Sequence, residues 1–294
     1  MRLKICIIGA SGFYGKPIYN ELCKRNDVVG TSHAGFPGKG FGKLDITDRA
    51  EVESFFRAHK PDIAINLAAI TDVDLCERER ELCLAVNSTG ARNVALACGL
   101  VGAKLCHFST DFVFDGAKGD YSESDAANPI NNYGKAKLEA EKAVQGQSGS
   151  AIIRTSTPYG GIAGAKKFVN QAIGRLSAGL EVFAFSDFTR SPTLVEEVAE
   201  NFPIILKKDF SGIINLAGSS QLSMYDAALE IASVFGFDDS MVRGSTGAQA
   251  GFCARRPPNT GLDVSLARGM GICMSTFTKG LERLRSQGLH RVRG

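Results

Sequence analysis

The stretch Lys4-Ile-Cys-Ile-Ile-Gly9-Ala-Ser-Gly12-Phe-Tyr-Gly15 decides the fold of this chain. An apolar run over Leu3–Ile8 predicts a buried strand, and the pattern over Phe13–Arg25 predicts the helix that follows it. The three glycines between them permit a tight turn and allow a pyrophosphate to approach the backbone. The N-terminus of the helix then faces the phosphate charge. Although the spacing is Gly-x-x-Gly-x-x-Gly, its place between a strand and a helix predicts a dinucleotide-binding turn.

Beyond this turn, strand and helix patterns alternate through the first half of the chain. Strands are predicted over Asp27–Gly30, Asp62–Leu67, Ala103–Phe108 and Ala151–Arg154, and helices over residues 47–59, Glu79–Cys98 and Tyr133–Val144. Such alternation indicates parallel strands joined by crossover helices, and strands rich in Ile, Val, Ala and Leu fit burial on both faces. We therefore expect an α/β fold with a Rossmann-type doubly wound parallel sheet.

The second half of the chain is less regular. Helices are predicted over Lys167–Ser177, Leu194–Leu206, Met224–Phe235 and Thr276–Gln287, strands over Glu181–Phe185 and Ser211–Leu216, and a loop over Arg255–Gly261. Because no flexible linker separates the halves, we expect a smaller α/β substrate-binding domain that interleaves with the first. The expected boundaries are 1–155 for the NAD(P)-binding domain, with returning segments near 190–217, and 156–189 with 218–294 for the substrate-binding part.

The composition argues against several classes of function. The chain has 294 residues, of which 44% are hydrophobic and 22% charged, as in a globular protein. A net charge of +3 is too small to indicate nucleic acid or a membrane surface as a partner, and no segment is long enough to span a bilayer. Eight cysteines without a Cys-x-x-Cys pair argue against a metal site. Interpreted as reduced thiols, they favour a cytoplasmic protein.

Tyr133 and Lys137 carry the chemistry that the sequence predicts. Four residues apart, a phenol and an ammonium share one face of a helix, whose start is indicated by Pro129–Asn132. A positive charge and a helix N-terminus both favour the phenolate, so we expect a lowered tyrosine pKa and a proton donor. An upstream hydroxyl in Ser109-Thr110-Asp111 can hold a carbonyl oxygen there, which suggests ketone reduction or alcohol oxidation. Taken alone, Tyr-x-x-x-Lys is more typical of an exposed amphipathic helix.

The end of the second predicted strand bears on the choice of cofactor. An NAD site usually carries an acid there, whereas this chain reads Val29-Gly-Thr-Ser-His33, followed by the basic Lys39 and Lys43. Without a carboxylate to repel a 2′-phosphate, and with His33 or Lys39 to pair with one, NADPH is favoured over NADH. Asp45 and Ile46 can border the adenine, although Asp45 can equally start the next helix.

These features, in this order, resemble the extended short-chain dehydrogenase/reductase superfamily. The motifs that carry the resemblance are the glycine turn, Asn66-Leu-Ala-Ala69, Ser109-Thr-Asp111, Tyr133-x-x-x-Lys137 and Arg154-Thr-Ser156. Within that superfamily the whole chain resembles the dTDP-4-dehydrorhamnose reductase family. The stretches that carry this closer resemblance are Leu44–Asp48, Pro61–Asn66, Thr71–Asp74, Phe108–Gly116, Phe168-Val169, Ser191–Thr193 and Arg256–Leu262.

The resemblance implies a role for each matched residue. Tyr133 would protonate the C4 carbonyl oxygen of a nucleotide-linked keto sugar, Thr110 would orient that carbonyl, and Lys137 would hold the nicotinamide ribose. Asn87 resembles the proton-relay asparagine, with a buried, hydrogen-bonded Asn as the alternative. The residues implied for the cofactor are Gly9, Ser11, Gly12, Phe13, Tyr14, Gly15, His33, Asp45, Ile46, Leu67, Ala68, Ala69, Tyr133 and Lys137. Those implied for the substrate are Ser109, Asp111, Phe112, Arg190 and Arg256, the last with an ordinary surface Arg as the alternative.

Three departures from the family lie near the expected sugar pocket. Phe112 stands where tyrosine is usual, Thr157-Pro158 where an aromatic residue is frequent, and Ser186–Arg190 where Asp-Gln is usual; the chain also lacks Trp. The expected function is NADPH-dependent reduction of a 4-keto sugar nucleotide. A non-catalytic subunit resembling the regulator of methionine adenosyltransferase, or another sugar-nucleotide reductase or epimerase, stays open, as does a homodimer. A 4,6-dehydratase is disfavoured, because Phe112 cannot abstract a proton.

Overall fold

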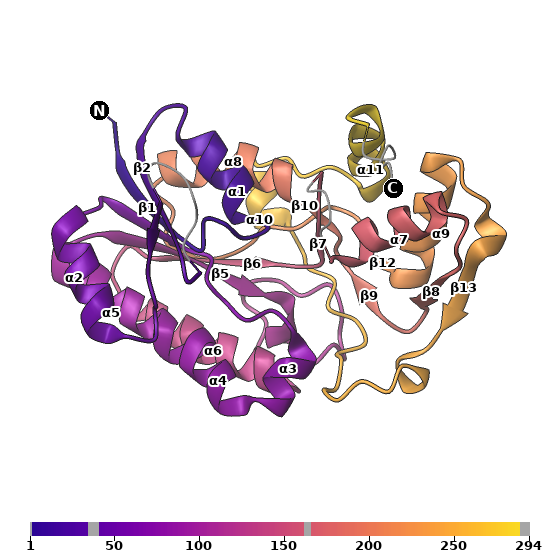
Figure 1. Ribbon diagram of the computed structural model, residues 1–294, viewed down its shortest axis with the longest axis horizontal. Coiled ribbons are helices and arrows are strands. Elements are labelled where there is room, and N and C mark those ends of the chain that lie inside the picture. Colours follow the sequence, from indigo (N-terminus) through magenta and orange to yellow (C-terminus); the bar gives the residue numbers. More distant parts are fainter. Residues whose placement is uncertain (1, 35–40, 162–165, 289–294) are drawn as a thin grey trace.

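The structure is a computed structural model that describes residues 2–34, 41–161 and 166–288. Its centre is a seven-stranded parallel sheet in the order β11-β6-β5-β4-β1-β2-β3 (Figure 1). The strands of this sheet are β1 (Lys4–Ile8), β2 (Asp27–Ser32), β3 (Phe41–Lys43), β4 (Ile63–Asn66), β5 (Lys104–Thr110), β6 (Ala151–Thr155) and β11 (Gly212–Asn215). The predicted Rossmann-type doubly wound sheet is therefore confirmed, with β3 as an edge strand that the sequence did not reveal.

Helices cover both faces of the sheet, so its strands are buried on both sides (Figure 1). One face carries α1 (Gly15–Leu22), α8 (Val195–Lys207) and α10 (Ser265–Gly269), and the other carries α2 (Arg49–His59), α5 (Ala91–Val101) and α6 (Asn132–Gln145). Alternate residues of β1 serve the two cores: Ile5 and Ile7 pack toward α1 and α8, and Cys6 and Ile8 toward α2 and α5. Each such buried aliphatic side chain contributes about 1.5–3 kcal/mol of transfer free energy.

The helix predicted over Glu79–Cys98 is interrupted. It consists of α4 (Arg80–Leu84), the π-helical turn η1 (Ala85–Gly90) and the first part of α5, and it is preceded by a short α3 (Val73–Arg78). Such π-turns are rare, and they occur frequently at functional sites. Here the turn presses Gly90 against Ile46, since a Cβ at Gly90 would lie 2.7 Å from that side chain.

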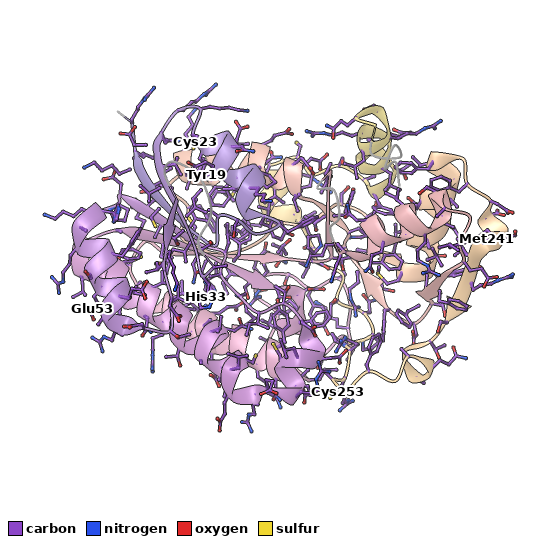
Figure 2. The ribbon with its side chains drawn as sticks, viewed as in Figure 1. Tyr19, Cys23, His33, Glu53, Met241 and Cys253 are labelled. Atoms are coloured by element: carbon purple, nitrogen blue, oxygen red, sulfur yellow. The ribbon has the colours of Figure 1, made fainter. Side chains whose placement is uncertain are left out.

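The second half of the chain builds a separate hydrophobic core at the right of Figure 1. Its main elements are β8 (Val182–Phe185), β13 (Val242–Ser245), α7 (Phe168–Ser177), α9 (Met224–Phe235) and α11 (Phe277–Ser286). The smaller pairs are β7 (Pro158–Tyr159) with β10 (Thr193–Leu194) and β9 (Thr189–Arg190) with β12 (Leu222–Ser223), and this half also has the 3₁₀ turns η3 (Asp239–Met241) and η4 (Gly247–Gln249). A further 3₁₀ turn, η2 (Asp111–Val113), follows β5 in the first half. Met241 marks the outer end of this region (Figure 2).

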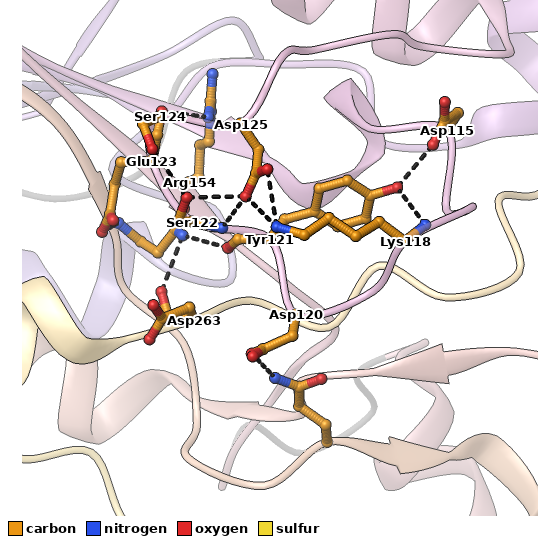
Figure 3. Close-up of polar contacts among 12 residues, drawn as sticks. Asp115, Lys118, Asp120, Tyr121, Ser122, Glu123, Ser124, Asp125, Arg154 and Asp263 are labelled. Carbon is orange, nitrogen blue, oxygen red and sulfur yellow. Dashed lines mark hydrogen bonds and ion pairs between the residues drawn. The ribbon is translucent and has the colours of Figure 1, made fainter.

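A hydrogen-bonded loop between η2 and α6 joins the two regions (Figure 3). Within the loop, Tyr121 donates to Asp115 at 2.6 Å. Asn215, at the end of β11, donates to the carbonyls of Tyr121 (2.8 Å) and Asp263 (2.9 Å). The chain thus returns from its second half to close the edge of the sheet. Among the residues placed by the structure, none of the helices has the length and apolar character needed to cross a membrane.

Candidate active site

The turn after β1 requires glycine at two points. Gly9 has a φ of +83°, and a Cβ there would lie 2.9 Å from the backbone nitrogen of Ala68. A Cβ at Gly15 would lie 2.3 Å from the carbonyl oxygen of Gly9. The amides of Gly9 and Ala10 both donate to the carbonyl of Thr31 at 2.9 Å, which ties the turn to β2. The turn therefore packs as closely as the sequence predicts for a phosphate-binding loop.

A cavity of about 420 Å³ opens above this turn. It lies at the carboxyl ends of β1 and β4, where the strand order reverses, which is the usual ligand position in doubly wound sheets. Nine of the residues implied for the cofactor line it: Gly9, Ser11, Gly12, His33, Asp45, Ile46, Leu67, Ala68 and Ala69. The other five do not: Gly15 packs beneath the turn, the ring of Phe13 lies under Lys167, and a second cavity is lined by Tyr14, Tyr133 and Lys137.

The far end of this cavity carries His33 and Asp45. His33 follows β2 directly (Figure 2), and its Nδ1 lies 3.8 Å from Asp45 Oδ2. Asp45 accepts hydrogen bonds from the hydroxyl of Thr47 (2.7 Å) and from its amide (2.9 Å), which lower the pKa of the Asp45 carboxyl. Ser32 is buried, and its hydroxyl has no partner within the described parts of the chain. Lys39, the other predicted phosphate ligand, lies outside the described residues.

A second cavity, of about 240 Å³, shares Leu67 and Ala69 with the first. Seven of the residues predicted for catalysis or substrate binding line it: Ser109, Thr110, Asp111, Phe112, Tyr133, Lys137 and Arg190. Thr157 and Pro158 line it as well. Two of the three departures from the family pattern, Phe112 and Thr157, therefore face this cavity. The third departure is the stretch Ser186–Arg190, and its last residue, Arg190, also lines the cavity.

Tyr133 sits in the first turn of α6. Asn131 caps this helix by accepting from the amide of Gly134 at 2.8 Å, as the sequence before the tyrosine indicates. A Cβ at Gly134 would lie 2.1 Å from the carbonyl oxygen of Phe112, so α6 begins in direct contact with η2. The ring of Phe112 meets that of Tyr133 edge-on at 6.0 Å.

The expectation of a lowered tyrosine pKa is wrong. Burial raises the pKa of Tyr133 well above its ordinary value, a hydrogen bond with Thr110 lowers it, and the negative charge of Asp111 raises it further. Lys137 points elsewhere, since its Nζ donates to the carbonyl of Phe108 at 2.6 Å and lies 3.2 Å from His107 Nε2. Burial lowers the pKa of Lys137 to about 8.

Asn87 clamps the backbone beside Tyr133. From η1, its Oδ1 accepts from the amide of Ile70 at 2.8 Å, and its Nδ2 donates to the carbonyl of the same residue at 2.9 Å. The sulfurs of Cys76 and Cys83 lie 3.8 and 3.5 Å from Nδ2. The geometry is that of the buried, hydrogen-bonded Asn; the relay role stays a prediction.

Asp111 and Arg190 are buried charged side chains that line the smaller cavity and influence each other electrostatically. Asp111 accepts from Ser156 (2.8 Å) and from Thr260, and burial raises its pKa. Arg190 donates to the carbonyl of Pro257 at 2.8 Å and lies 5.3 Å from the ring centre of Phe112. Burial lowers the pKa of Arg190 to about 10. Both side chains line the cavity while already holding protein partners.

Two residues implied for the substrate are engaged elsewhere. Ser109 donates to Glu141 at 2.5 Å, so its hydroxyl serves the buried ion pair between Glu141 and Arg154 rather than the open cavity. Arg256 pairs with Asp74 at 2.9 Å and is absent from the lining of both cavities. The structure therefore does not bring Arg256 to the pocket that the sequence assigns to it.

Sequence reasoning missed two residues at this site, Lys167 and His107. Lys167 lines the smaller cavity, with its Nζ 5.8 Å from the ring centre of Phe13. Tyr14, which the resemblance implies for the cofactor, instead reaches this cavity, where its hydroxyl shares a 2.6 Å hydrogen bond with Thr155. His107 lies beneath Lys137. Lys167 directly precedes the Phe168-Val169 motif and His107 directly precedes Phe108-Ser-Thr, so each was signalled only by its neighbours.

The comparisons with known proteins agree with this geometry. A probable low-salt glycan biosynthesis reductase of Haloferax volcanii is 33% identical over 95% of this chain and 96% of its own length. The β subunit of methionine adenosyltransferase 2 from Xenopus laevis is 31% identical over 92% of this chain and 83% of its own. The crystal structure of a dTDP-4-dehydrorhamnose reductase from Bacillus anthracis in complex with NADP matches with a TM-score of 0.89 and 30% identity, over 98% of this chain and 100% of that one. The family described as the RmlD substrate binding domain matches residues 3–288, and the chain belongs to this family.

Proposed function

We propose that the protein uses NADPH to reduce the 4-keto group of a nucleotide-linked deoxysugar. The observation that carries the proposal is the junction of the two cavities: they share Leu67 and Ala69, and the smaller one contains Tyr133. A dinucleotide in the larger cavity would thus end beside a proton donor. Two relatives that match nearly the whole chain are named as reductases, and one of them is in complex with NADP.

The larger cavity fits a phosphorylated dinucleotide. The turn leaves no room for a Cβ at Gly9, the Ser32 hydroxyl is buried without a partner in the part of the chain that the structure covers, and His33 stands at the end of β2. A hydroxyl and an imidazole at this point suit a 2′-phosphate, while Asp45 suits the adenine edge. When bound, the nicotinamide supplies the hydride; NADH is the alternative donor.

The residues of the smaller cavity divide the remaining work. Tyr133 gives its proton to the developing alkoxide, and Thr110, which is hydrogen-bonded to it, orients the carbonyl oxygen. Lys137 holds the ribose hydroxyls, and its charge then offsets the burial that raises the pKa of the phenol. Arg190 and Lys167 bring positive charge to the cavity wall, which favours a substrate that carries phosphate. We assign Asn87 to the proton relay.

We propose that the two structural regions divide the ligands. Residues 1–155, with returning segments near 190–217, bind the cofactor, and residues 156–189 and 218–294 hold the sugar nucleotide. Phe112 and Thr157 then set the choice of sugar, since both line the smaller cavity.

A panel of nucleotide-linked 4-keto sugars, with NADPH oxidation as the readout, tests the proposal. The wild-type protein should turn over at least one of them. Tyr133→Phe should keep NADPH binding and lose about 10²-fold or more in kcat, because general acid catalysis contributes that much. Equal activity of the mutant and the wild type would exclude Tyr133 as the proton donor.

A second function is favoured by the match to the methionine adenosyltransferase β subunit, which is named as a subunit. On this reading the protein binds NADPH without reducing a sugar and acts on a partner enzyme. Tight NADPH binding with no turnover across the panel, together with a changed rate of a methionine adenosyltransferase on addition of the protein, would support this function over the first.

A further inference from the structure

His107 is a buried imidazole that the proposed chemistry leaves unused. It lies on β5 with 0% of its surface exposed, and its Nε2 is 3.2 Å from Lys137 Nζ. Its other nitrogen, Nδ1, has no hydrogen-bond partner within the described residues. Lys137 Nζ also donates to the carbonyl of Phe108 at 2.6 Å, so the acceptors of this ammonium within the described residues are neighbours on β5.

The contact determines the protonation of the ring. An ammonium has three donors and no acceptor, so Nε2 of His107 must accept and the ring proton must sit on Nδ1. A second positive charge beside Lys137 in this buried place is unfavourable. Burial and the lysine charge therefore hold the pKa of His107 well below its ordinary value. The ring acts as a neutral acceptor.

Other titratable groups surround Lys137. Glu141 lies one turn further along α6, and Cys83 approaches from α4; both raise the pKa of the lysine against the effect of burial. Glu141 is already bound by Arg154 at 2.7 Å and by Ser109 at 2.5 Å. The direct hydrogen-bond partners of the Lys137 ammonium therefore lie on β5.

We propose that His107 is a positioning residue for the catalytic lysine: it holds the Lys137 ammonium on β5, at the cavity that Lys137 and Tyr133 both line, and so keeps it charged. The inference deepens the proposed function and rests on it. Removing the acceptor should destabilise the ammonium. Lys137 would then lose its proton at a lower pH, and the pH range of activity would narrow on the alkaline side.

The tautomer of His107 tests the geometry without any turnover. Two-bond proton–nitrogen spectra of the ¹⁵N-labelled protein report which ring nitrogen carries the proton. The chain has four histidines, and the His107 signal is the one that disappears in His107→Gln. We expect a neutral ring with its proton on Nδ1 across pH values of about 5.5–7.5, where an ordinary histidine titrates. A proton on Nε2, or a titration near about 6.5, would overturn the proposal.

Kinetics then test the positioning. His107→Leu removes the acceptor and should lower kcat about tenfold or more, with the alkaline limb of the pH profile about one unit lower. His107→Gln keeps an acceptor near the position of Nε2 and should recover most of the activity. Cys106→Ala is the matched control: Cys106 is a buried neighbour on β5 that packs in the core on the α1 and α8 side of the sheet.

Two outcomes contradict the positioning role. Equal losses in His107→Leu and His107→Gln would indicate that only packing matters, and so would an unshifted alkaline limb in His107→Leu. If the wild-type protein reduces no sugar, the proposed function fails, and the tautomer together with the pH dependence of NADPH affinity still decides the role of His107.

Discussion

Replacing Asn87 with Ala should destabilise the protein by about 3 kcal/mol. Asn87 is 1% exposed and makes two hydrogen bonds to the backbone of Ile70, at 2.8 and 2.9 Å. Its removal leaves one amide and one carbonyl unpaired, at about 1–3 kcal/mol each. Ile70 is half-buried, and the thiol of Cys76 lies 3.7 Å from its carbonyl. The total penalty for the two groups therefore falls in the lower part of the range that the two single penalties allow.

Urea unfolding followed by circular dichroism measures this loss. With a slope of about 3 kcal/mol/M, the midpoint should fall by about 1 M. Ile70 also lines the larger cavity, so the folded variant should bind NADPH more weakly and turn over more slowly.

Asn215→Ala is the matched control. Asn215 is 0% exposed and donates to two backbone carbonyls, at 2.8 and 2.9 Å, at the edge of the sheet rather than at either cavity. It should lose comparable stability and keep the activity of the folded protein. A midpoint shift below about 0.3 M for Asn87→Ala would refute the claim that the hydrogen bonds between Asn87 and Ile70 stabilise the protein. Equal losses of activity in both variants would refute its link to function.

Three further predictions concern single positions. Gly15→Ala should lower the free energy of unfolding by about 1–3 kcal/mol and abolish NADPH binding, because its Cβ would meet the Gly9 carbonyl at 2.3 Å. As the control, Gly174→Ala, in an open position of α7, should stabilise the protein by about 0.5–1 kcal/mol. A rate profile against pH should show kcat falling as pH rises through about 8, since Lys137, with its pKa lowered to about 8, then loses its charge; a flat profile to pH of about 10 would contradict this assignment. Thr157→Gly should raise the thermal midpoint, because Thr157 holds a φ of +30° at a cost of about 1–3 kcal/mol; a lowered midpoint would show that its side-chain packing outweighs the strain.

The elements that follow from local patterns were predictable. The strand before Gly9 and the starts of α2 and α6 each depend on a few consecutive residues, and the structure has them where the sequence places them, with Asp48 and Asn131 as the helix caps. The π-turn η1 was not predictable, because an apolar helical period continues through it. The edge strand β3 was missed because three residues are too few to show a period.

The sequence by itself determined the sheet, the glycine turn and the grouping of Thr110 with Tyr133, because apolar periodicity, glycine conformation and strand-end position are local properties. Only the tertiary structure decided the ionisation of the site. Burial raises the pKa of Tyr133 and lowers that of Lys137, and it is a contact with His107, distant in sequence, that turns the lysine toward β5. Spacing places two side chains on one helix face, but desolvation and long-range partners, which exist only in the packed molecule, determine their charge.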